Sequence, residues 1–125
     1  MTGPRRPDDR RAVGREGEAL ALAYLSARGF VPIARNYRTR FGEIDLIGEM
    51  DDTLVFVEVR TRRTAAFGSG RESVTARKRA KVRRLAAAFL TERRMWSRAV
   101  RFDVVEVTLD PLSGAADIAH LPGVF

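Results

Sequence analysis

Hydrophobic and polar positions are ordered most clearly between residues 41 and 62, where two short apolar runs flank a polar segment. The runs are Ile44–Ile47 and Leu54–Val59, and Glu49–Asp52 separates them. Runs of this length, rich in β-branched and aromatic residues and joined by an acidic turn, predict a β-hairpin.

A two-residue turn at Asp51 and Asp52 would place Asp45 directly opposite Glu58. Because side chains alternate along a strand, both acids would share one face with four further residues, namely Glu43, Leu54, Phe56 and Arg60. Like charges that face each other destabilise a sheet. A divalent cation bound by Asp45 and Glu58 would explain the pair, and so would acids that face water or pair with a nearby arginine.

An Ala- and Leu-rich segment from Val13 to Arg28 predicts a helix that ends at Gly29. Its inward side would carry Ala21, Leu25 and Arg28, and Glu18 lies on the same stripe. An acid on the buried side of a helix is costly unless it is paired or binds a metal. Glu18 is therefore a candidate third ligand, although a favourable interaction with the helix dipole explains it equally well.

The longest predicted helix runs from Val74 to about Arg94. Its apolar stripe has the helical spacing i, i+3, i+4 and i+7 and consists of Val82, Leu85, Ala86 and Phe89. Lys78 lies within this stripe near the helix start, where it could snorkel to solvent or reach a charged site at the edge of the sheet.

The remaining segments complete an α/β domain over residues 13–125. We expect a disordered basic arm at 1–12, strands at 30–38, 100–109 and 115–121, and a loop at 61–73. The single histidine, His120, lies on the last strand and is expected to be structural. The order helix, three strands, helix, two strands indicates helices packed on a sheet.

Composition narrows the class of protein. The chain of 125 residues has no cysteine, which excludes disulfides and zinc–thiolate sites. Because it has no apolar run of about 20 residues and no apolar core of a signal peptide, we expect a cytoplasmic protein without a membrane partner. The sequence leaves a homodimer open.

The net charge of +7 is unevenly distributed. Residues 41–59 contain six acids and no base, whereas residues 71–101 contain eleven bases and two acids. An acidic hairpin inside a basic frame suits a metal site that meets a polyanion.

Four segments, in this order, resemble the YraN family of small bacterial proteins. They are GEALALAYLSARGF at 17–30, ARNYRTRFGEIDLI at 34–47, LVFVEVRTR at 54–62 and RFDVV at 101–105. That family is similar to archaeal Holliday junction resolvases of the PD-(D/E)xK nuclease superfamily. The resemblance implies a restriction-endonuclease-like three-layer core with a mixed central sheet, and phosphodiester cleavage that depends on Mg²⁺ or Mn²⁺. It assigns the acids of the motif to Glu18, Asp45 and Glu58.

The position of the motif lysine is a departure from the pattern, because Arg60 occupies it. Arginine stays protonated in proteins and cannot act as a general base. It can still hold a phosphate and stabilise negative charge. Lys78 could take the place of the lysine from the second helix.

The sequence thus predicts a metal-dependent nuclease that acts on DNA, including branched or flap structures. One alternative is a nucleic-acid-binding module with the same fold and little turnover, and another is a domain that binds an acidic protein partner. The predicted catalytic residues are Glu18, Asp45, Glu58, Arg60 and Lys78. The predicted nucleic-acid contacts are Arg62, Arg63, Arg71, Arg77, Lys81, Arg83 and Arg84.

Overall fold

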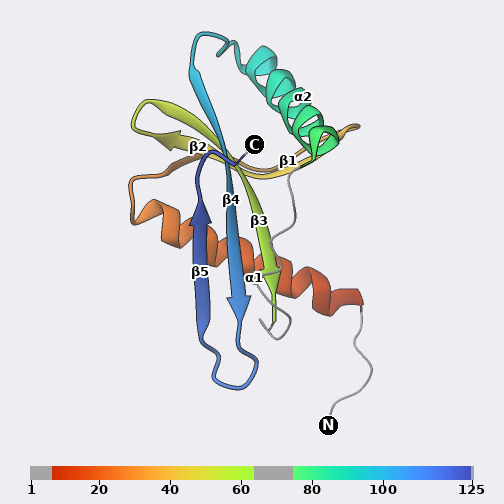
Figure 1. Ribbon diagram of the computed structural model, residues 1–125, viewed down its shortest axis with the longest axis vertical. Coiled ribbons are helices and arrows are strands. Elements are labelled where there is room, and N and C mark those ends of the chain that lie inside the picture. Colours follow the sequence, from red (N-terminus) through yellow and green to blue (C-terminus); the bar gives the residue numbers. More distant parts are fainter. Residues whose placement is uncertain (1–6, 64–74, 125) are drawn as a thin grey trace.

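The computed structural model of the protein describes residues 7–63 and 75–124, and side chains from residue 11 onward. Its elements follow the predicted order (Figure 1). They are α1 (Pro7–Ser26), β1 (Val31–Thr39), β2 (Gly42–Met50), β3 (Thr53–Arg62), α2 (Ala76–Arg93), β4 (Ala99–Leu109) and β5 (Ala116–Leu121).

The strands form one mixed five-stranded sheet in the order β1-β2-β3-β4-β5. Three neighbouring pairs are antiparallel, and β3 and β4 are parallel. Antiparallel neighbours can be joined by short turns, but a parallel pair needs a long crossover connection. The segment that contains α2 provides this crossover between β3 and β4.

The predicted hairpin register is confirmed next to the turn, and the paired ladder ends one residue short of the predicted Asp45–Glu58 pair. Leu46 pairs with Val57, and Met50 pairs with Thr53. The turn residues Asp51 and Asp52 have φ angles of 47° and 64°, in the left-handed region. Two consecutive left-handed residues are the signature of a type I′ turn, whose twist matches that of the two strands.

Two hydrophobic clusters on opposite faces of the sheet make a three-layer α/β domain. On one face, Ala21 and Leu25 of α1 pack against alternate strand residues that include Val55 and Val57. On the other face, Leu85, Ala86 and Phe89 of α2 pack against strand residues that include Leu54 and Phe56. The predicted inward stripe of the second helix is therefore confirmed, with Val82 partly buried at its edge. Figure 1 shows α1 crossing behind β3 and β4, while α2 lies over the region of β2.

Several predicted boundaries need correction. Helix α1 begins at Pro7, six residues before the predicted start at Val13, and residues 1–6 of the predicted arm lie outside the described residues. The helix ends at Ser26, so Arg28 is not on its inward side; its guanidinium is exposed and lies 3.5 Å from the ring centroid of Tyr24. Strand β3 continues through Arg62 into the predicted loop, because it keeps its pairing with β4 to that residue.

Among the described residues, no helix is both long and apolar enough to cross a lipid bilayer.

Candidate metal centre

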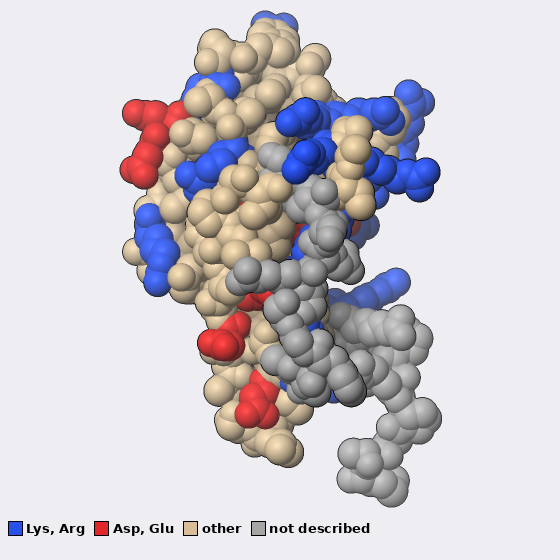
Figure 2. Space-filling view, in the orientation of Figure 1, with Lys and Arg blue, Asp and Glu red and all other residues tan. Residues whose placement is uncertain are grey.

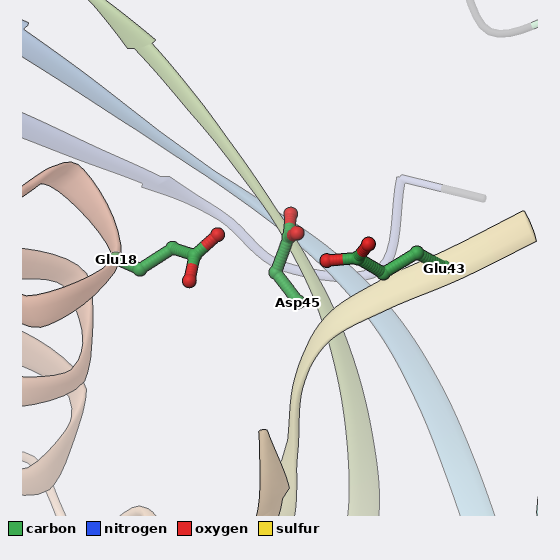
Figure 3. A group of neighbouring side chains, drawn as sticks. All are labelled: Glu18, Glu43 and Asp45. Atoms are coloured by element: carbon green, nitrogen blue, oxygen red, sulfur yellow. The ribbon is translucent and has the colours of Figure 1, made fainter. Parts of the chain in front are cut away.

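Three carboxylates from two elements converge beside strand β2 (Figure 3). Glu18 extends from α1, and Glu43 and Asp45 extend from β2. One oxygen atom of each lies within 4.8 Å of the others. This is a spacing at which oxygen ligands could surround one divalent cation, since Mg²⁺–oxygen distances are about 2.0–2.1 Å.

Helix α1 can bring Glu18 to the strands because its neighbour in the chain is a glycine. A Cβ atom on Gly17 would lie only 1.8 Å from Oγ1 of Thr61 on β3. Any side chain at this position would push the helix away from the sheet. The glycine therefore fixes how closely α1, and with it Glu18, approaches the hairpin.

Strand β2 has a break in its alternation next to Asp45. Ile44 packs in the cluster beneath α2, whereas Leu46, two residues later, packs in the cluster beneath α1. Asp45 lies between them. Asn36 of β1 falls between the partners of these two residues, and it has a φ angle of 52°, in the left-handed region. At this irregularity Glu43 and Asp45 lie close to Glu18 of α1.

Hydrogen bonds hold the carboxylates in place. With its amide nitrogen turned to the acids, Asn36 donates to Oε1 of Glu43 (3.0 Å) and to Oε1 of Glu18 (3.1 Å). The backbone amide of Val59 on β3 donates to Oδ2 of Asp45 at 2.7 Å. The acids are thus positioned by neighbouring strands as well as by their own elements.

The electrostatic environment of the acids opposes their charge. Burial is the main cause that raises the pKa of Asp45 to about 7, and the charges of three neighbouring carboxylates add to it: Glu18, Glu43 and Glu58. Together they outweigh the hydrogen bond from Val59, which lowers the pKa. Burial and the charge of Glu43 also raise the pKa of Glu18, although the Asn36 hydrogen bond lowers it. A group of acids that disfavour one another's ionisation would be stabilised by a bound cation.

Glu58 lies beside this group rather than within it. It lines a pocket of about 350 Å³ together with Glu43 and Asp45. Its Oε1 is 3.7 Å from Nζ of Lys78, and its Oε2 is 3.4 Å from a guanidinium nitrogen of Arg60. The structure therefore brings the three predicted acids together, but Glu43 completes the tightest set and Glu58 faces two cations.

The two candidate cations differ in their access to the pocket. Lys78 and Lys81 of α2 line it, whereas Arg60 does not, and only 16% of the Arg60 side chain is exposed. Glu106 of β4 lies beside Arg60 in the parallel register. Its Oε1 is buried and, within the described part of the chain, accepts no hydrogen bond.

The predicted nucleic-acid contacts fall into two groups. Arg77, Lys81, Arg83 and Arg84 are all on α2, and Figure 2 shows basic side chains gathered where Figure 1 places the first turns of α2 and the tip of the β1–β2 hairpin. Arg62 and Arg63 lie at the far end of β3, and Arg63 lines a different pocket with Asp110 and Asp117. Arg71 lies outside the described residues.

Sequence reasoning missed Glu43 as a member of the tight carboxylate group and Asn36 as its hydrogen-bonding partner. Glu43 was placed on the same strand face as Asp45, but strict alternation gave no reason to select it. The available signal for Asn36 was an asparagine in the middle of a predicted strand, since this residue type tolerates the left-handed conformation.

His120 belongs to a second polar cluster. Its Nε2 lies 2.7 Å from Oδ2 of Asp103, which is fully buried on β4. Arg101 donates two hydrogen bonds of 2.9 Å to the same carboxylate, and the amide of Gly123 donates a further one. The cluster joins β4, β5 and the residues that follow β5, so a structural role for His120 accords with its contacts.

Comparisons with known proteins place the chain in a family. The sequence profile of the Uncharacterised protein family UPF0102 matches residues 17–107. A UPF0102 protein of Moorella thermoacetica is 45% identical over 116 residues, which cover 93% of this chain and 97% of that protein. A UPF0102 protein of Beutenbergia cavernae is 48% identical over 113 residues, covering 90% and 95% of the two chains. The resemblance to the YraN family is thereby confirmed, and the chain belongs to that family, UPF0102.

Proposed function

We propose that this protein is a metal-dependent nuclease that hydrolyses phosphodiester bonds in nucleic acid, with DNA as the expected substrate. The observation that carries the proposal is the convergence of Glu18, Glu43 and Asp45 within 4.8 Å, beside a pocket that Lys78 and Lys81 also line. Carboxylates and cations around one pocket suit a metal ion and a phosphate together. The restriction-endonuclease-like core implied by the family resemblance remains part of this proposal.

The residues present fit a hard divalent cation. All the candidate ligand atoms are carboxylate oxygens, which Mg²⁺ and Mn²⁺ prefer. The burial and the neighbouring carboxylates that raise the pKa of Asp45 to about 7 support the proposal, because a bound cation would offset both. Glu18, Glu43 and Asp45 would hold the ion, and Glu58 would bind it directly or through water. When bound, such an ion lowers the pKa of a coordinated water and neutralises charge on the phosphate.

The protein's own cations would handle the phosphate. Lys78 lines the pocket and is 3.7 Å from Glu58, so it is placed to contact a phosphate oxygen next to the acids. Arg60 lies behind Glu58 and is mostly buried, so its part would be to orient Glu58 rather than to touch the substrate. In this proposal Lys78 takes the position that the motif lysine has in the family pattern.

A cleavage assay tests the proposal. Purified protein is incubated with Mg²⁺ or Mn²⁺ and a panel of duplex, single-stranded, flap and four-way DNA, with a matching RNA panel. Asp45→Asn removes a ligand charge with little change of shape, and we expect it to lower cleavage by at least a hundredfold. Asp117→Asn is the matched control, because Asp117 is exposed on β5, and it should retain activity. Cleavage that survives Asp45→Asn would contradict the assignment.

Two further variants separate the roles of the cations. If Lys78 contacts the phosphate, Lys78→Ala should abolish cleavage while Arg60→Ala leaves a measurable rate. If Arg60 limits the chemistry instead, Arg60→Lys should raise the rate, because it restores a titratable cation beside Glu58.

The second candidate function is a nucleic-acid-binding module with little or no turnover. Arg60 favours it, because an arginine that is paired with Glu58 and absent from the pocket lining cannot supply general-base chemistry. Tight DNA binding by both wild type and Arg60→Lys, without cleavage of any substrate, would establish this alternative.

A further inference from the structure

We infer that a second basic pocket, formed by Arg11 and Arg15 of α1 and Arg38 of β1, binds the phosphates of the nucleic-acid strand on the opposite side of the carboxylates from α2. The inference rests on the proposed function and names residues that sequence reasoning did not select. The substrate would then run across the carboxylates, from the basic residues of α2 on one side to Arg11, Arg15 and Arg38 on the other.

The second pocket has a volume of about 490 Å³ and shares an acid with the first. Arg11, Gly14, Arg15 and Glu18 line it from α1, and Asn36, Arg38 and Glu43 line it from the strands. Glu43 also lines the pocket beneath α2. The carboxylate group therefore lies between two pockets, one with lysines from α2 and the other with arginines from α1 and β1.

The spacing of these residues along α1 accounts for the arrangement. Positions 11, 14, 15 and 18 fall on one face of a helix, one turn apart. A Cβ atom on Gly14 would meet no atom within 4 Å, so this face of α1 is open at the middle of the pocket. Arg11 and Arg15 are exposed, and their guanidinium groups have room to meet an incoming anion.

Arg38 links the basic pocket to the acids. Its Nε donates to Oε2 of Glu43 at 2.9 Å, yet 75% of its side chain remains exposed. Guanidinium groups bind phosphate bidentately and stay charged, so a set of three is suited to a backbone phosphate. A small monoanion would satisfy only one pocket, whereas a polyanion could occupy both. The occupant we infer is accordingly a nucleic-acid strand that spans the metal centre.

The test measures binding separately from cleavage. Fluorescent DNA strands are titrated against protein in Ca²⁺, which occupies oxygen sites, and in EDTA. We expect Arg15→Ala to weaken binding by about threefold to tenfold, with a larger loss for Arg11→Ala/Arg15→Ala, and each lost phosphate contact to lower the slope of log K against log salt by about 0.7–0.9. Arg28→Ala is the matched control, because it removes the same charge from just beyond the other end of α1, where Arg28 lies over Tyr24.

The length of the DNA strand distinguishes the two basic pockets. If they lie on opposite sides of the carboxylates, shortening the DNA from one end should erase the effect of Arg15→Ala on binding but preserve that of Lys81→Ala. Shortening the DNA from the other end should do the reverse. Equal losses for Arg15→Ala and Arg28→Ala would overturn the inference. Loss of cleavage by Asp45→Asn alongside equal losses at positions 15 and 28 would leave the nuclease proposal standing. Arg15-dependent binding without any cleavage would leave only the inference standing.

Discussion

Asp45 is the acid of the site whose ionisation is most opposed by its surroundings. It is largely buried, it accepts a hydrogen bond from Val59, and three carboxylates lie close enough to raise its pKa. For an acid, a folded-state pKa of about 7 against an ordinary value of 3.8 means that the folded chain binds the proton more tightly than the unfolded chain. Between about pH 4 and pH 7 the unfolded chain has lost the Asp45 proton while the folded chain still holds it. The free energy of unfolding therefore falls as the pH rises through this range.

Asp45→Asn should stabilise the metal-free protein at pH 8, because it removes a buried charge that its neighbours repel. We expect a gain of about 1–3 kcal/mol in the free energy of unfolding at pH 8, and little difference at pH 4, where Asp45 is protonated. Urea unfolding in EDTA at both pH values measures this. Mg²⁺ should then stabilise wild type and not the variant. A variant less stable than wild type at pH 8 would show that the carboxylate is satisfied without a cation.

Asp103 is a buried acid with the opposite balance. Burial would raise its pKa, but hydrogen bonds from Arg101, Gly123 and His120 outweigh burial and hold the pKa below its usual value. The ionised carboxylate therefore stabilises the fold above about pH 4, and this contribution is lost as the pH falls through the lowered folded-state pKa.

Asp103→Asn should destabilise the protein by about 2–4 kcal/mol at neutral pH, because it leaves Arg101 without its buried partner. Urea titrations between pH 2 and pH 7 provide the measurement, and the gap between variant and wild type should narrow toward the acid end. Asp117→Asn, an exposed change on β5, is the control and should be close to neutral. A gap that stayed constant down to pH 2 would argue against an ionised Asp103 as its source.

Some residues of the site could be predicted from the sequence and others could not. The two-residue turn and the alternation of the hairpin were enough to predict that Asp45 and Glu58 come close, and helical periodicity was enough to turn Glu18 inward. Glu43 and Asn36 could not be ranked in this way, because the break in alternation between Ile44 and Leu46 depends on packing against both helices. Departures from regular geometry are set by tertiary contacts, which a periodic pattern does not contain.

At the scale of elements, the contact between α1 and β3 decides where Glu18 lies. Gly17 is buried against Thr61 with no space for a Cβ atom, whereas Gly14, one turn earlier, faces open space. Close packing therefore requires a glycine at position 17 but not at position 14. Replacing each glycine with alanine compares the two positions directly.

Gly17→Ala should displace α1, lower the free energy of unfolding by about 1–3 kcal/mol and weaken Mg²⁺ binding, because Glu18 moves with the helix. Gly14→Ala should instead raise the free energy of unfolding by roughly 0.5–1 kcal/mol, since alanine is the better helix former. Thermal unfolding and calorimetric Mg²⁺ titration measure both effects. A neutral Gly17→Ala would mean that α1 can shift without cost and that the close approach does not position Glu18.

Element order was predictable, while element ends were less so. The hairpin, the apolar stripe of α2 and the final strands follow from local patterns that the structure reproduces. The early start of α1 at Pro7 was not expected, because the polar residues before Val13 show no apolar periodicity. Proline suits the first turn of a helix, and so do acids such as Asp8 and Asp9, and these local rules were the available signal.

For the molecule as a whole, acidic and basic residues from different elements meet around one pocket. Acids of α1 and β2 meet beside β2, and basic residues of α2 line and surround the adjoining pocket. The sequence showed that acidic and basic segments alternate along the chain. It could not show which bases adjoin the acids, since Arg63 lies near them in the chain but lines a different pocket, whereas Lys78 and Lys81 come from α2, within the crossover.

The exposed bases in the first half of α2 should therefore govern general affinity for nucleic acid. Arg77→Ala/Arg83→Ala should weaken binding to all DNA sequences alike and lower the slope of log K against log salt by up to about 1.8, because each phosphate contact on duplex DNA contributes about 0.9. Arg28→Ala/Arg93→Ala removes the same charge from residues that lie over the rings of Tyr24 and Phe89, away from the first turns of α2. If both double variants lost affinity equally, net charge would be responsible rather than a binding surface. A wild-type affinity that stayed flat between 50 and 200 mM salt, against the steep loss expected for a protein with several phosphate contacts, would remove nucleic acid as the partner of this face.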